Sequence, residues 1–497
     1  MTDDRKTPPA RVVETHISVL VFVGDRVYKL RKPVHFDFLD FTDRAVREAD
    51  CRREVVLNRR LAPDVYLGVA DIVMDGEPID HMVVMRSLPG ERRLAALVRA
   101  GADVGGWLSQ IAAVLVAFHA AAERSPEISQ SATRAALARH WEDNFEETRR
   151  FVGTVLEPAA DLKIRTLVDQ WLRRYESLLD ARIAAERICD GHGDLQAEDV
   201  FCLDDGVRIL DCIEFSDRLR YGDVCADVAF LAMDLERLGR PDAAERFVSE
   251  YESLATEQFP APLLHHYIAL RAYVRAKVAC LEWEQGMGGA DERARQLHAL
   301  TWRHLRLAQP AVVLVGGLPG TGKSTLAAAL AARTGWRLLR SDEIRRQLEL
   351  TGGTAAARHP NHPGTGRYSP EAVGAVYAEL RRRARELLEE GEAVILDASW
   401  IDAAQRAAAR QVAEDTGSGL IELCCRCDGS IAAERIRRRQ GGDDLSDATP
   451  EVRSLMAERM DAWPSATVID TSDATTADVL SSALSALAHA GGRHNGT

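Results

Sequence analysis

The chain has 497 residues, of which 46% are hydrophobic and 28% charged, and its formal net charge at pH 7 is −13. A chain of this length is too long for one hydrophobic core, so two or three domains are expected, and the composition excludes a wholly disordered protein. The acidic balance would repel nucleic acid and anionic membranes, which favours a small-molecule or protein partner and disfavours nucleic acid.

Residues 1–10 are polar, contain proline and lack an apolar core, so they predict a disordered tail and no signal peptide. No run of about 18 apolar residues occurs, which argues against a transmembrane helix and a membrane partner. The nine cysteines are scattered without repeated C-x-x-C spacing, which is typical of reduced thiols in a cytoplasmic protein. Cys424, Cys425 and Cys427 lie in an apolar run that favours a buried strand over a metal site.

Residues 11–32 alternate apolar and polar side chains around Gly24 and Asp25, which predicts a β-hairpin with a tight turn. Lys29 closes the second strand, and the charged helix predicted next in the chain carries Glu54. In kinase-like folds a strand lysine contacts the ATP phosphates and is held by a glutamate of the following helix. A pair of exposed surface residues is the alternative interpretation.

Residues 105–186 show helical periodicity, and His119 follows the apolar face of one such helix. A buried core histidine is favoured there over a catalyst. The next segment, Gly191-His-Gly-Asp-Leu-Gln-Ala-Glu-Asp-Val200, is followed by an apolar strand that ends at Asp211. A base, a metal ligand and a second metal ligand occur in this order in phosphoryl-transfer sites, so Asp194, Asp199 and Asp211 are the candidates. Turn-forming aspartates are the alternative.

This segment resembles the aminoglycoside phosphotransferase-like branch of the kinase-like fold, whose loop reads H-G-D-L-H-x-x-N. The resemblance implies a protein-kinase-like α+β domain over residues 11–308. It also implies that Asp194 is the catalytic base, that Asp211 binds Mg²⁺, and that Lys29 and Glu54 anchor ATP.

The chain departs from the family pattern at three places. Gln196 stands where the family has His, and Asp199 stands where it has the metal-ligating Asn. An aspartate still offers oxygen to Mg²⁺, so the metal site is altered and not erased. No G-x-G-x-x-G loop occurs in the hairpin, which leaves residues 14–18 as the only candidate flap over the phosphates.

Downstream of this loop, Asp223 and Asp227 resemble the acidic residues that pin the catalytic loop of the family, which implies an architectural role. Arg271, Arg275 and Lys277 follow on a long predicted helix. They could line a pocket for an acidic substrate, but a solvated or ion-paired helix face is the favoured interpretation. The helical run ends before Pro310, which places the domain boundary between residues 308 and 309.

Residues 311–325 predict a buried strand, a glycine-rich loop and the first turn of a helix. The pattern G-x-x-x-x-G-K-[ST] is complete from Gly317 to Ser324. Glycines let backbone N–H groups converge on a polyanion, the lysine neutralises the β- and γ-phosphates, and the serine hydroxyl binds Mg²⁺. The predicted nucleotide-binding residues are Gly317, Gly320, Thr321, Gly322, Lys323, Ser324 and Thr325.

The rest of residues 309–497 predicts a five-strand doubly wound α/β sheet of the P-loop NTPase type. Asp342 and Asp397 each end a strand, at the edge where such sheets bind ligands. Asp342 is the candidate base, with a helix N-cap as the alternative, and Asp397 is the Walker-B-like carboxylate for Mg²⁺. Residues 351–369 predict a long substrate-side loop.

The basic helix that carries Arg435 and Arg439 resembles the lid of P-loop small-molecule and polynucleotide kinases, whose arginines close on the phosphates. A solvated basic helix is the alternative. Taken together, the two halves are similar to a bacterial fusion family that joins an aminoglycoside phosphotransferase-like domain to a P-loop domain of the zeta-toxin, gluconate-kinase and polynucleotide-kinase type.

We therefore expect an ATP- and Mg²⁺-dependent phosphotransferase, centred on Lys323 and Asp342, that acts on a hydroxyl of a small-molecule acceptor. The alternative is a nucleotide-sensing or scaffolding protein whose N-terminal kinase-like domain is catalytically degenerate. Neither the acceptor nor the oligomeric state follows from the sequence.

Overall fold

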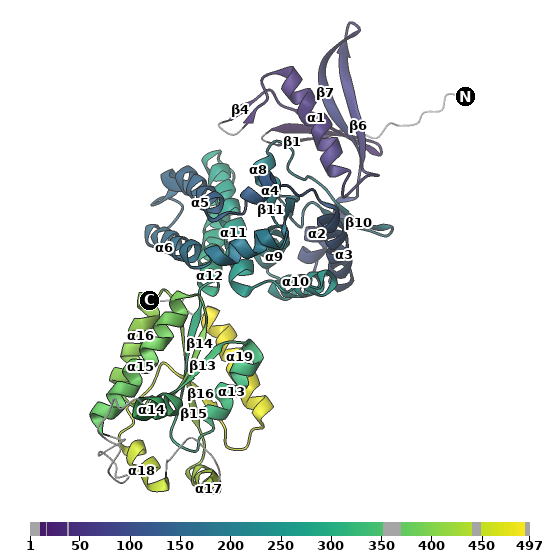
Figure 1. Ribbon diagram of the computed structural model, residues 1–497. Coiled ribbons are helices and arrows are strands. Elements are labelled where there is room, and N and C mark those ends of the chain that lie inside the picture. The colour runs from purple at the N-terminus through teal and green to yellow at the C-terminus, as the bar shows by residue number, and fades with distance from the viewer. Residues whose placement is uncertain (1–9, 16, 37–38, 351–368, 440–448, 493–497) are drawn as a thin grey trace. The chain divides into compact units, whose positions relative to one another are not determined.

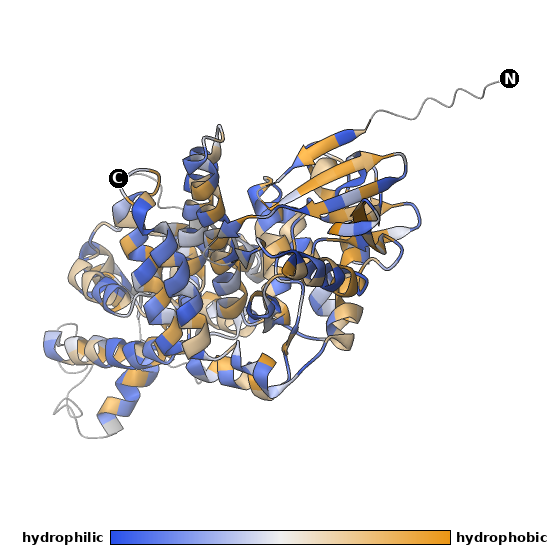
Figure 2. Cartoon of the chain, turned by 90° about the horizontal axis from the view of Figure 1, so that it is seen from above, coloured by the Kyte–Doolittle hydropathy of each residue, from blue (hydrophilic) through white to orange (hydrophobic). Residues whose placement is uncertain are grey.

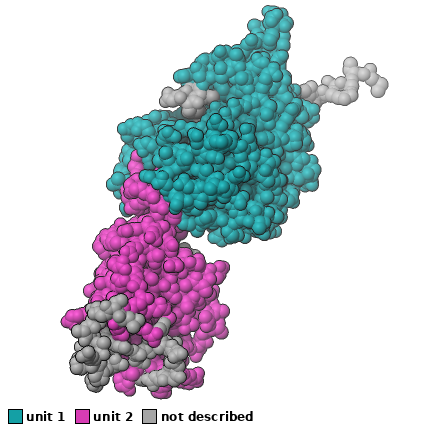
Figure 3. All heavy atoms as spheres, in the orientation of Figure 1, with its two compact units in different colours: residues 1–164, 176–304 teal, residues 165–175, 305–497 magenta. Residues whose placement is uncertain are grey.

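Figure 1 shows the computed structural model of the chain, which describes residues 10–15, 17–36, 39–350, 369–439 and 449–492. The chain forms two compact units, residues 1–164 with 176–304 and residues 165–175 with 305–497, which Figure 3 colours separately. The predicted tail and the predicted loop at residues 351–369 lie outside the described residues, except for their last residues. Within the described chain, no helix has the length and apolar character needed to cross a membrane.

Unit 1 begins with an antiparallel sheet in the strand order β1-β2-β3-β7-β6. The predicted hairpin is confirmed, since β2 pairs with β3 across Gly24 and Asp25, and β1 adds a further strand at the edge. The strands of this sheet are β1 (Arg11–Glu14), β2 (Ser18–Val23), β3 (Arg26–Arg31), β6 (Tyr66–Met74) and β7 (Glu77–Arg86), and the short pair β4 (His35–Phe36) and β5 (Leu39–Asp40) lies apart from it.

Helix α1 (Arg44–Asn58) covers one face of this sheet. Asp43 caps its N-terminus by accepting the Ala45 N–H at 2.8 Å, as short polar side chains do at this position. Cys51 and Val55 of α1 are buried together with side chains of β6 and β7. This packing fixes the helix against β6 and β7, and Glu54 faces the strand that carries Lys29.

The remainder of unit 1 is mostly helical, and α9 is buried along almost its whole length between α10 and α11. Orange and blue alternate along the helices in Figure 2, as expected when one side of a helix packs in the core and the other meets water. The helical elements between residues 90 and 307 are η1 (Gly90–Arg92), α2 (Leu94–Arg99), α3 (Gly105–Ala121), α4 (Pro126–Gln130), α5 (Arg134–Thr148), η2 (Arg149–Phe151), α6 (Pro158–Arg174), α7 (Glu176–Ala184), α8 (Asp217–Arg220), α9 (Val224–Arg237), α10 (Pro241–Ala255), α11 (Ala261–Glu284) and α12 (Ala290–Leu307). Of these, α6 from Arg165 and α12 from Leu305 belong to unit 2.

Two short antiparallel strand pairs bracket the segment that carries the H-G-D motif. β8 (Ile188–Asp190) pairs with β11 (Tyr221–Asp223), and β9 (Val200–Leu203) pairs with β10 (Gly206–Ile209). The motif therefore lies in the connection from β8 to β9, and Asp211 follows the end of β10.

Unit 2 contains the predicted doubly wound sheet, with five parallel strands in the order β13-β14-β12-β15-β16. The chain moves from β12 to one side of the sheet and later to the other, which creates a crevice at the carboxyl end of β12. The elements are β12 (Ala311–Gly316), α13 (Lys323–Thr334), β13 (Arg337–Arg340), α14 (Ser341–Leu350), α15 (Pro370–Glu389), β14 (Val394–Asp397), α16 (Ala403–Asp415), β15 (Gly419–Arg426), α17 (Gly429–Arg439), α18 (Pro450–Glu458), β16 (Thr467–Asp470) and α19 (Thr476–Gly492).

The side chains of β12 explain the layers of unit 2. Val312 and Leu314 belong to the core under α15 and α16, whereas Val313 and Val315 belong to the core under α13 and α19. Figure 1 shows these two helix pairs on opposite faces of the sheet. Side chains of a strand alternate between faces, so a continuous apolar run is what a strand buried on both sides requires.

Candidate functional sites

In unit 1, β3 and α1 bring together the two residues of the predicted ATP anchor. Lys29 Nζ lies 2.8 Å from Glu54 Oε1 and 2.7 Å from Asp211 Oδ1. Burial opposes the charge on the lysine, but Asp211 and Glu54 outweigh it and raise the pKa of Lys29 above its ordinary value. The same ammonium lowers the pKa of the Asp211 carboxyl. Both groups are therefore charged at neutral pH.

Arg31, which the sequence analysis missed, completes this cluster. Its guanidinium is buried and lies 2.6 Å from Asp50 Oδ2 and 2.6 Å from Glu54 Oε2, and it also contacts Glu214. The signal was present in the sequence, because Arg31 shares a strand face with Lys29, and Asp50 lies one helical turn before Glu54.

Glu214 is the third carboxyl that contacts Arg31. Burial raises the pKa of Glu214 to about 8, even though Arg31 opposes the effect. A neutral side chain at this position leaves the charge of Arg31 to be shared by Asp50 and Glu54.

The H-G-D segment is held by Asp227 of α9. The Asp227 carboxylate accepts the His192 N–H at 2.7 Å and the Gly193 N–H at 2.9 Å. Its Oδ2 also lies 3.2 Å from Nε2 of His119, so the expectation of a buried core histidine is confirmed. Gly193 has a φ of +88°, and a Cβ there would lie 2.8 Å from the Leu219 carbonyl oxygen, so only glycine fits.

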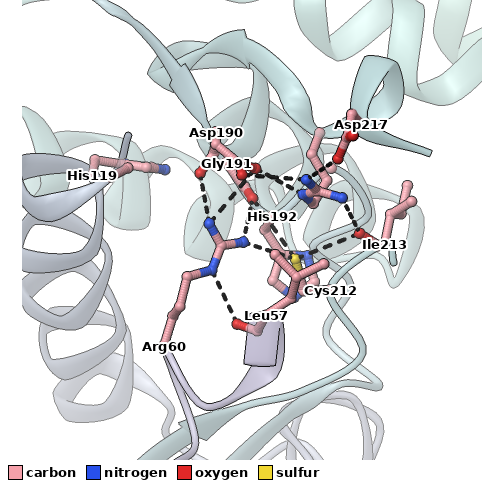
Figure 4. Close-up of polar contacts among 12 residues, drawn as sticks. Leu57, Arg60, His119, Asp190, Gly191, His192, Cys212, Ile213 and Asp217 are labelled. Atoms are coloured by element: carbon pink, nitrogen blue, oxygen red, sulfur yellow. Dashed lines mark hydrogen bonds and ion pairs between the residues drawn. The ribbon is translucent and has the colours of Figure 1, made fainter. Parts of the chain in front are cut away.

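Arg60, which follows the end of α1, also holds the H-G-D segment in place. Figure 4 shows that Arg60 donates to the carbonyl oxygens of Asp190 and Gly191, both at 3.0 Å, and to Cys212 Sγ at 3.2 Å. Its Nε donates to the Leu57 carbonyl at 3.0 Å. One side chain thereby fixes the start of the H-G-D segment and the residue after Asp211. No sequence motif identified Arg60, because Asp190, Gly191 and Cys212 lie 130 or more residues away from it.

The three candidate aspartates differ in the direction in which their surroundings shift the pKa. Asp194 Oδ2 accepts a hydrogen bond of 2.9 Å from Gln196, and burial raises the pKa of Asp194. Burial, followed by repulsion from Asp211 and Asp194, raises the pKa of Asp199 well above its ordinary value. Asp211 has a φ of +64°, and its conformation is held by the contact with Lys29 and by an N–H donated to Tyr66 Oη at 3.1 Å.

Helix α11 carries basic residues beside this loop, and one of them contradicts the expectation of a solvated face. Lys277 forms an ion pair of 3.1 Å with Glu147, as expected. Arg271, by contrast, is 8% exposed, and its Nε has no hydrogen-bond partner among the described residues. Its guanidinium lies over the Phe230 ring at 5.0 Å. Burying an unpaired charge costs several kcal/mol, whereas a cation–π contact returns about 0.5–2 kcal/mol.

In unit 2 the phosphate loop follows β12 in the conformation that its glycines permit. Gly317, Gly320 and Gly322 have φ values of +141°, +82° and +79°. A Cβ on Gly317 would lie 2.5 Å from the Cys425 carbonyl oxygen, and one on Gly320 would lie 2.6 Å from the Ala432 carbonyl oxygen. α13 begins at Lys323, so its first N–H groups lack partners within the helix and are available to an anion.

Thr471, which the sequence analysis missed, also holds the phosphate loop in place. Thr471 follows β16, and its Oγ1 lies 2.8 Å from the Thr321 carbonyl and 3.1 Å from the Arg426 carbonyl. Arg435 donates to the Thr471 carbonyl oxygen at 2.8 Å. Arg439 ends α17, and its side chain lies outside the described residues.

A cavity of about 460 Å³ adjoins the phosphate loop at the carboxyl edge of the sheet. Lys323 lines it from one side and Asp342, in the first turn of α14, lines it from another. Asp342 forms an ion pair with Arg345, which also lines the cavity. A bound acceptor could thus contact a carboxylate and the phosphate-loop lysine at once.

Asp397, at the end of β14, is 4% exposed, and its Oδ1 has no hydrogen-bond partner in the described part of the chain. Its Oδ2 lies 3.4 Å from Arg340 Nε. A buried carboxylate oxygen without a partner is costly, which fits a place for a cation. The described residues contain no group of three or more His, Cys, Asp or Glu positioned around one metal. A cation in either unit would therefore need phosphate or water oxygens as well.

All nine cysteines lie in the described chain and are free. Cys424 and Cys425 are buried in β15 as predicted, whereas Cys427 follows the end of that strand and is only partly buried.

The folds and sites together define a fusion of a kinase-like domain with a P-loop kinase-like domain. Residues 38–263 match the model of the phosphotransferase enzyme family, and residues 312–463 match the model of an AAA domain. Uncharacterized proteins of Mycobacterium tuberculosis (strain ATCC 25618 / H37Rv) and Mycobacterium bovis (strain ATCC BAA-935 / AF2122/97) are each 42% identical over 461 residues, which is 93% of this chain and 92% of the relative.

The chain belongs to the family of these mycobacterial proteins, which joins an aminoglycoside phosphotransferase-like domain to a C-terminal P-loop kinase-like domain. Among solved structures, a choline/ethanolamine kinase family protein from Mesorhizobium loti is 16% identical, with 61% of this chain and 93% of that chain covered and a TM-score of 0.40. A gluconokinase from Sinorhizobium meliloti 1021 is 20% identical, with 36% and 92% covered and a TM-score of 0.27. Both domains belong to kinase families, which supports a phosphotransferase.

Proposed function

We propose that the chain is an ATP- and Mg²⁺-dependent phosphotransferase whose C-terminal site transfers a phosphoryl group to a hydroxyl of a small-molecule acceptor. The observation that carries the proposal is that Lys323 of the phosphate loop and Asp342 line one cavity of about 460 Å³. This volume suits a small molecule and lies within the range of ordinary ligand pockets. The free thiols fit a cytoplasmic location.

In this proposal the acceptor hydroxyl attacks the γ-phosphorus, the bond to the β,γ-bridging oxygen breaks, and ADP leaves. Asp342 takes the hydroxyl proton, and Arg345 holds its carboxylate in place. The first N–H groups of α13 and the Lys323 ammonium bind the phosphates and stabilise the charge that develops on them. Gly320 and Thr321 belong to the same loop and Thr325 to the first turn of α13, and their backbone shapes the phosphate-binding site.

Ser324 and Asp397 are the proposed Mg²⁺-holding residues, and the unpartnered Oδ1 of Asp397 supports this assignment. Bound Mg²⁺ would neutralise charge on the β- and γ-phosphates. Arg435 and Arg439 are the proposed lid clamps. Because Arg435 donates to the Thr471 carbonyl, clamping requires that it exchange this carbonyl for a phosphate oxygen.

For unit 1 we propose an altered second phosphotransferase site of the same chemistry. Lys29, held by Glu54, would bind ATP phosphates, and Asp194 would act as the base. Asp199 and Asp211 would be the Mg²⁺ ligands. Lys29 and Asp211 lie 2.7 Å apart and neutralise each other's charge. The two groups would separate when phosphates bind to Lys29 and Mg²⁺ binds to Asp211.

A nucleotide-sensing or scaffolding protein is the second candidate, and two features of the sequence favour it for unit 1. Asp199 stands where the family has the metal-ligating Asn, and no G-x-G-x-x-G loop is present to cover the phosphates. In that case unit 1 would bind nucleotide without turnover, and unit 2 would bind ATP as a regulatory ligand.

The test is a screen for acceptor-stimulated ADP release by the full chain. Sugars, nucleosides, aminoglycosides and short oligonucleotides are offered to the wild type, to Lys323→Ala and to Asp194→Ala. We expect stimulated release that falls about 10²-fold or more in Lys323→Ala, the scale for removing one preorganised charge at a transferring phosphate. Tight ATP binding without stimulation by any acceptor would favour the sensor instead.

A further inference from the structure

Arg271 and Arg275 lie one helical turn apart on α11, and the charges of both oppose the rise in the pKa of Asp194. Arg275 Nη1 lies 3.8 Å from Asp194 Oδ2, which is its only ion pair within the described chain. Arg271 is buried one turn earlier and makes neither a hydrogen bond nor an ion pair to any described residue. Residues at i and i+4 share a helix face, so the two guanidinium groups belong to one surface beside the proposed base.

The charge of Arg271 is not balanced by a dedicated protein partner. Burial lowers the pKa of Arg271, and the neighbouring charges that oppose this are Asp227 and Asp194. Asp227 is already engaged by the N–H groups of His192 and Gly193, and Asp194 accepts a hydrogen bond from Gln196. Neither carboxylate is thus available as a dedicated partner for Arg271.

Asp143 and Glu147 of the neighbouring α5 already pair with other cations. Burial, followed by repulsion from Arg271, Lys277 and Arg218, lowers the pKa of His140 on α5 to about 3. Lys277 pairs with Glu147, and Arg218 pairs with Asp143. Arg271 therefore has no ion-pair partner among the described residues, and Arg275 has only its 3.8 Å contact with Asp194.

We propose that Arg271 and Arg275 form an anion-binding subsite beside Asp194, so that the acceptor of the unit 1 site is a hydroxyl compound carrying a phosphate or carboxylate group. The inference rests on the proposed role of Asp194 as the base of that site. A guanidinium pair binds oxyanions through charge-assisted hydrogen bonds. The same pair would repel an acceptor with ammonium groups. The proposed subsite would therefore disfavour a polycationic antibiotic as the acceptor.

The subsite would also orient the acceptor. Its anionic group would meet Arg271 and Arg275, and the hydroxyl would then be held near Asp194, which Arg275 approaches to 3.8 Å. Binding energy far from the reacting atoms would in this way position the hydroxyl for transfer.

The experiment is calorimetric titration of the full chain with inorganic phosphate, in the presence of excess ADP and Mg²⁺ so that nucleotide occupies the phosphate-binding loops. The proteins compared are the wild type, Arg271→Met, Arg275→Met and Asp194→Asn. Arg246→Met, which removes an exposed arginine of α10 paired loosely with Glu250 at 3.8 Å, is the matched control. Phosphate sites elsewhere in the chain contribute equally to all five proteins, so the differences between them report on this subsite.

We expect each of Arg271→Met and Arg275→Met to weaken phosphate binding by about tenfold or more, the scale for losing one charge-assisted hydrogen bond. Arg246→Met should bind as the wild type does, and Asp194→Asn should bind at least as tightly because a competing anion has been removed. Thermal unfolding provides a second readout. Arg271→Met should unfold at the wild-type temperature or above it, because it replaces a buried unpaired charge by an apolar side chain.

Unchanged phosphate affinity in both α11 variants would overturn the inference, as would a lower unfolding temperature of Arg271→Met with phosphate affinity intact, since the arginine would then be structural. Acetate and an aminoglycoside are titrated in the same way. Acetate binding with the same dependence on the arginines would place carboxylates among the acceptors, and phosphate binding alone would restrict them to phosphorylated compounds. Arginine-independent aminoglycoside binding tighter than that of phosphate would contradict the proposal.

The phosphate-binding result does not depend on whether unit 1 transfers phosphate. Phosphate binding that depends on both arginines, in a protein that releases no extra ADP with any phosphorylated acceptor, would support the subsite and refute the proposed phosphotransfer in unit 1. Stimulated ADP release that requires Asp194 but not the arginines would support phosphotransfer and refute the subsite.

Discussion

Replacing Arg31 by methionine should destabilise unit 1 by about 3–5 kcal/mol, the usual cost of removing one partner from a buried ion pair. The side chain is 1% exposed and contacts the carboxyls of Asp50, Glu54 and Glu214. When Arg31 is removed, Glu54 still has Lys29 as an ion-pair partner at 2.8 Å. Glu214 can remain protonated, because burial has already raised its pKa to about 8. The loss should therefore be near the lower limit at pH 6 and near the upper limit at pH 8.

The measurement is urea unfolding of the full chain followed by tryptophan fluorescence at both pH values. With a slope of about 3 kcal/mol/M, the unit 1 midpoint should fall by roughly 1–1.7 M urea. The unit 2 transition serves as an internal reference. Arg52→Met is the matched control, since Arg52 is an exposed arginine of α1 whose pair with Glu48 is worth about 0.3–0.5 kcal/mol. Equal midpoints for Arg31→Met and Arg52→Met would refute the role of Arg31 as the counter-ion of the cluster.

Three further outcomes follow from single side chains. The folded chain keeps the Glu214 proton up to about pH 8, whereas the unfolded chain releases it near pH 4.3. The wild type should therefore lose stability relative to Glu214→Gln as the pH rises from 5 to 8, and parallel stability curves would contradict this. Asp397→Asn should weaken Mg²⁺-dependent ATP binding about tenfold or more while Mg²⁺-free binding stays unchanged, by calorimetry; equal losses with and without Mg²⁺ would argue against a metal role. Thr471→Val should cost about 1 kcal/mol of stability and also weaken ATP binding, whereas Thr416→Val, at another buried threonine, should affect only stability.

Local patterns predicted much of the architecture and part of the sites. The apolar run of β12 and the glycine spacing after it were enough to predict the parallel sheet and the phosphate loop, because both depend on residues adjacent in sequence. The proximity of Lys29 to Glu54 was also predictable, since a strand and the next helix place these side chains opposite each other.

Residues whose partners are distant in sequence were not predicted. Arg60 and Thr471 act through backbone carbonyls, which carry no residue-specific signal. The burial of Arg271 depends on how α11 packs against α9, and its basic neighbours on the same helix favoured a solvated face. Long-range packing of this kind is decided by the tertiary fold and not by helix periodicity.

The direct test of the central claim is the steady-state kinetics of acceptor-stimulated ADP release by the wild type, Lys323→Ala, Asp342→Asn and Asp194→Asn. If the C-terminal cavity is the main phosphotransfer site, Asp342→Asn should lose kcat by about 10²-fold or more with little change in the KM for ATP, as expected for a lost general base. Lys323→Ala should lose both kcat and ATP affinity, and Asp194→Asn should keep the stimulated rate. Stimulated release that survives in Lys323→Ala and Asp342→Asn and disappears in Asp194→Asn would contradict the claim and place the chemistry in unit 1.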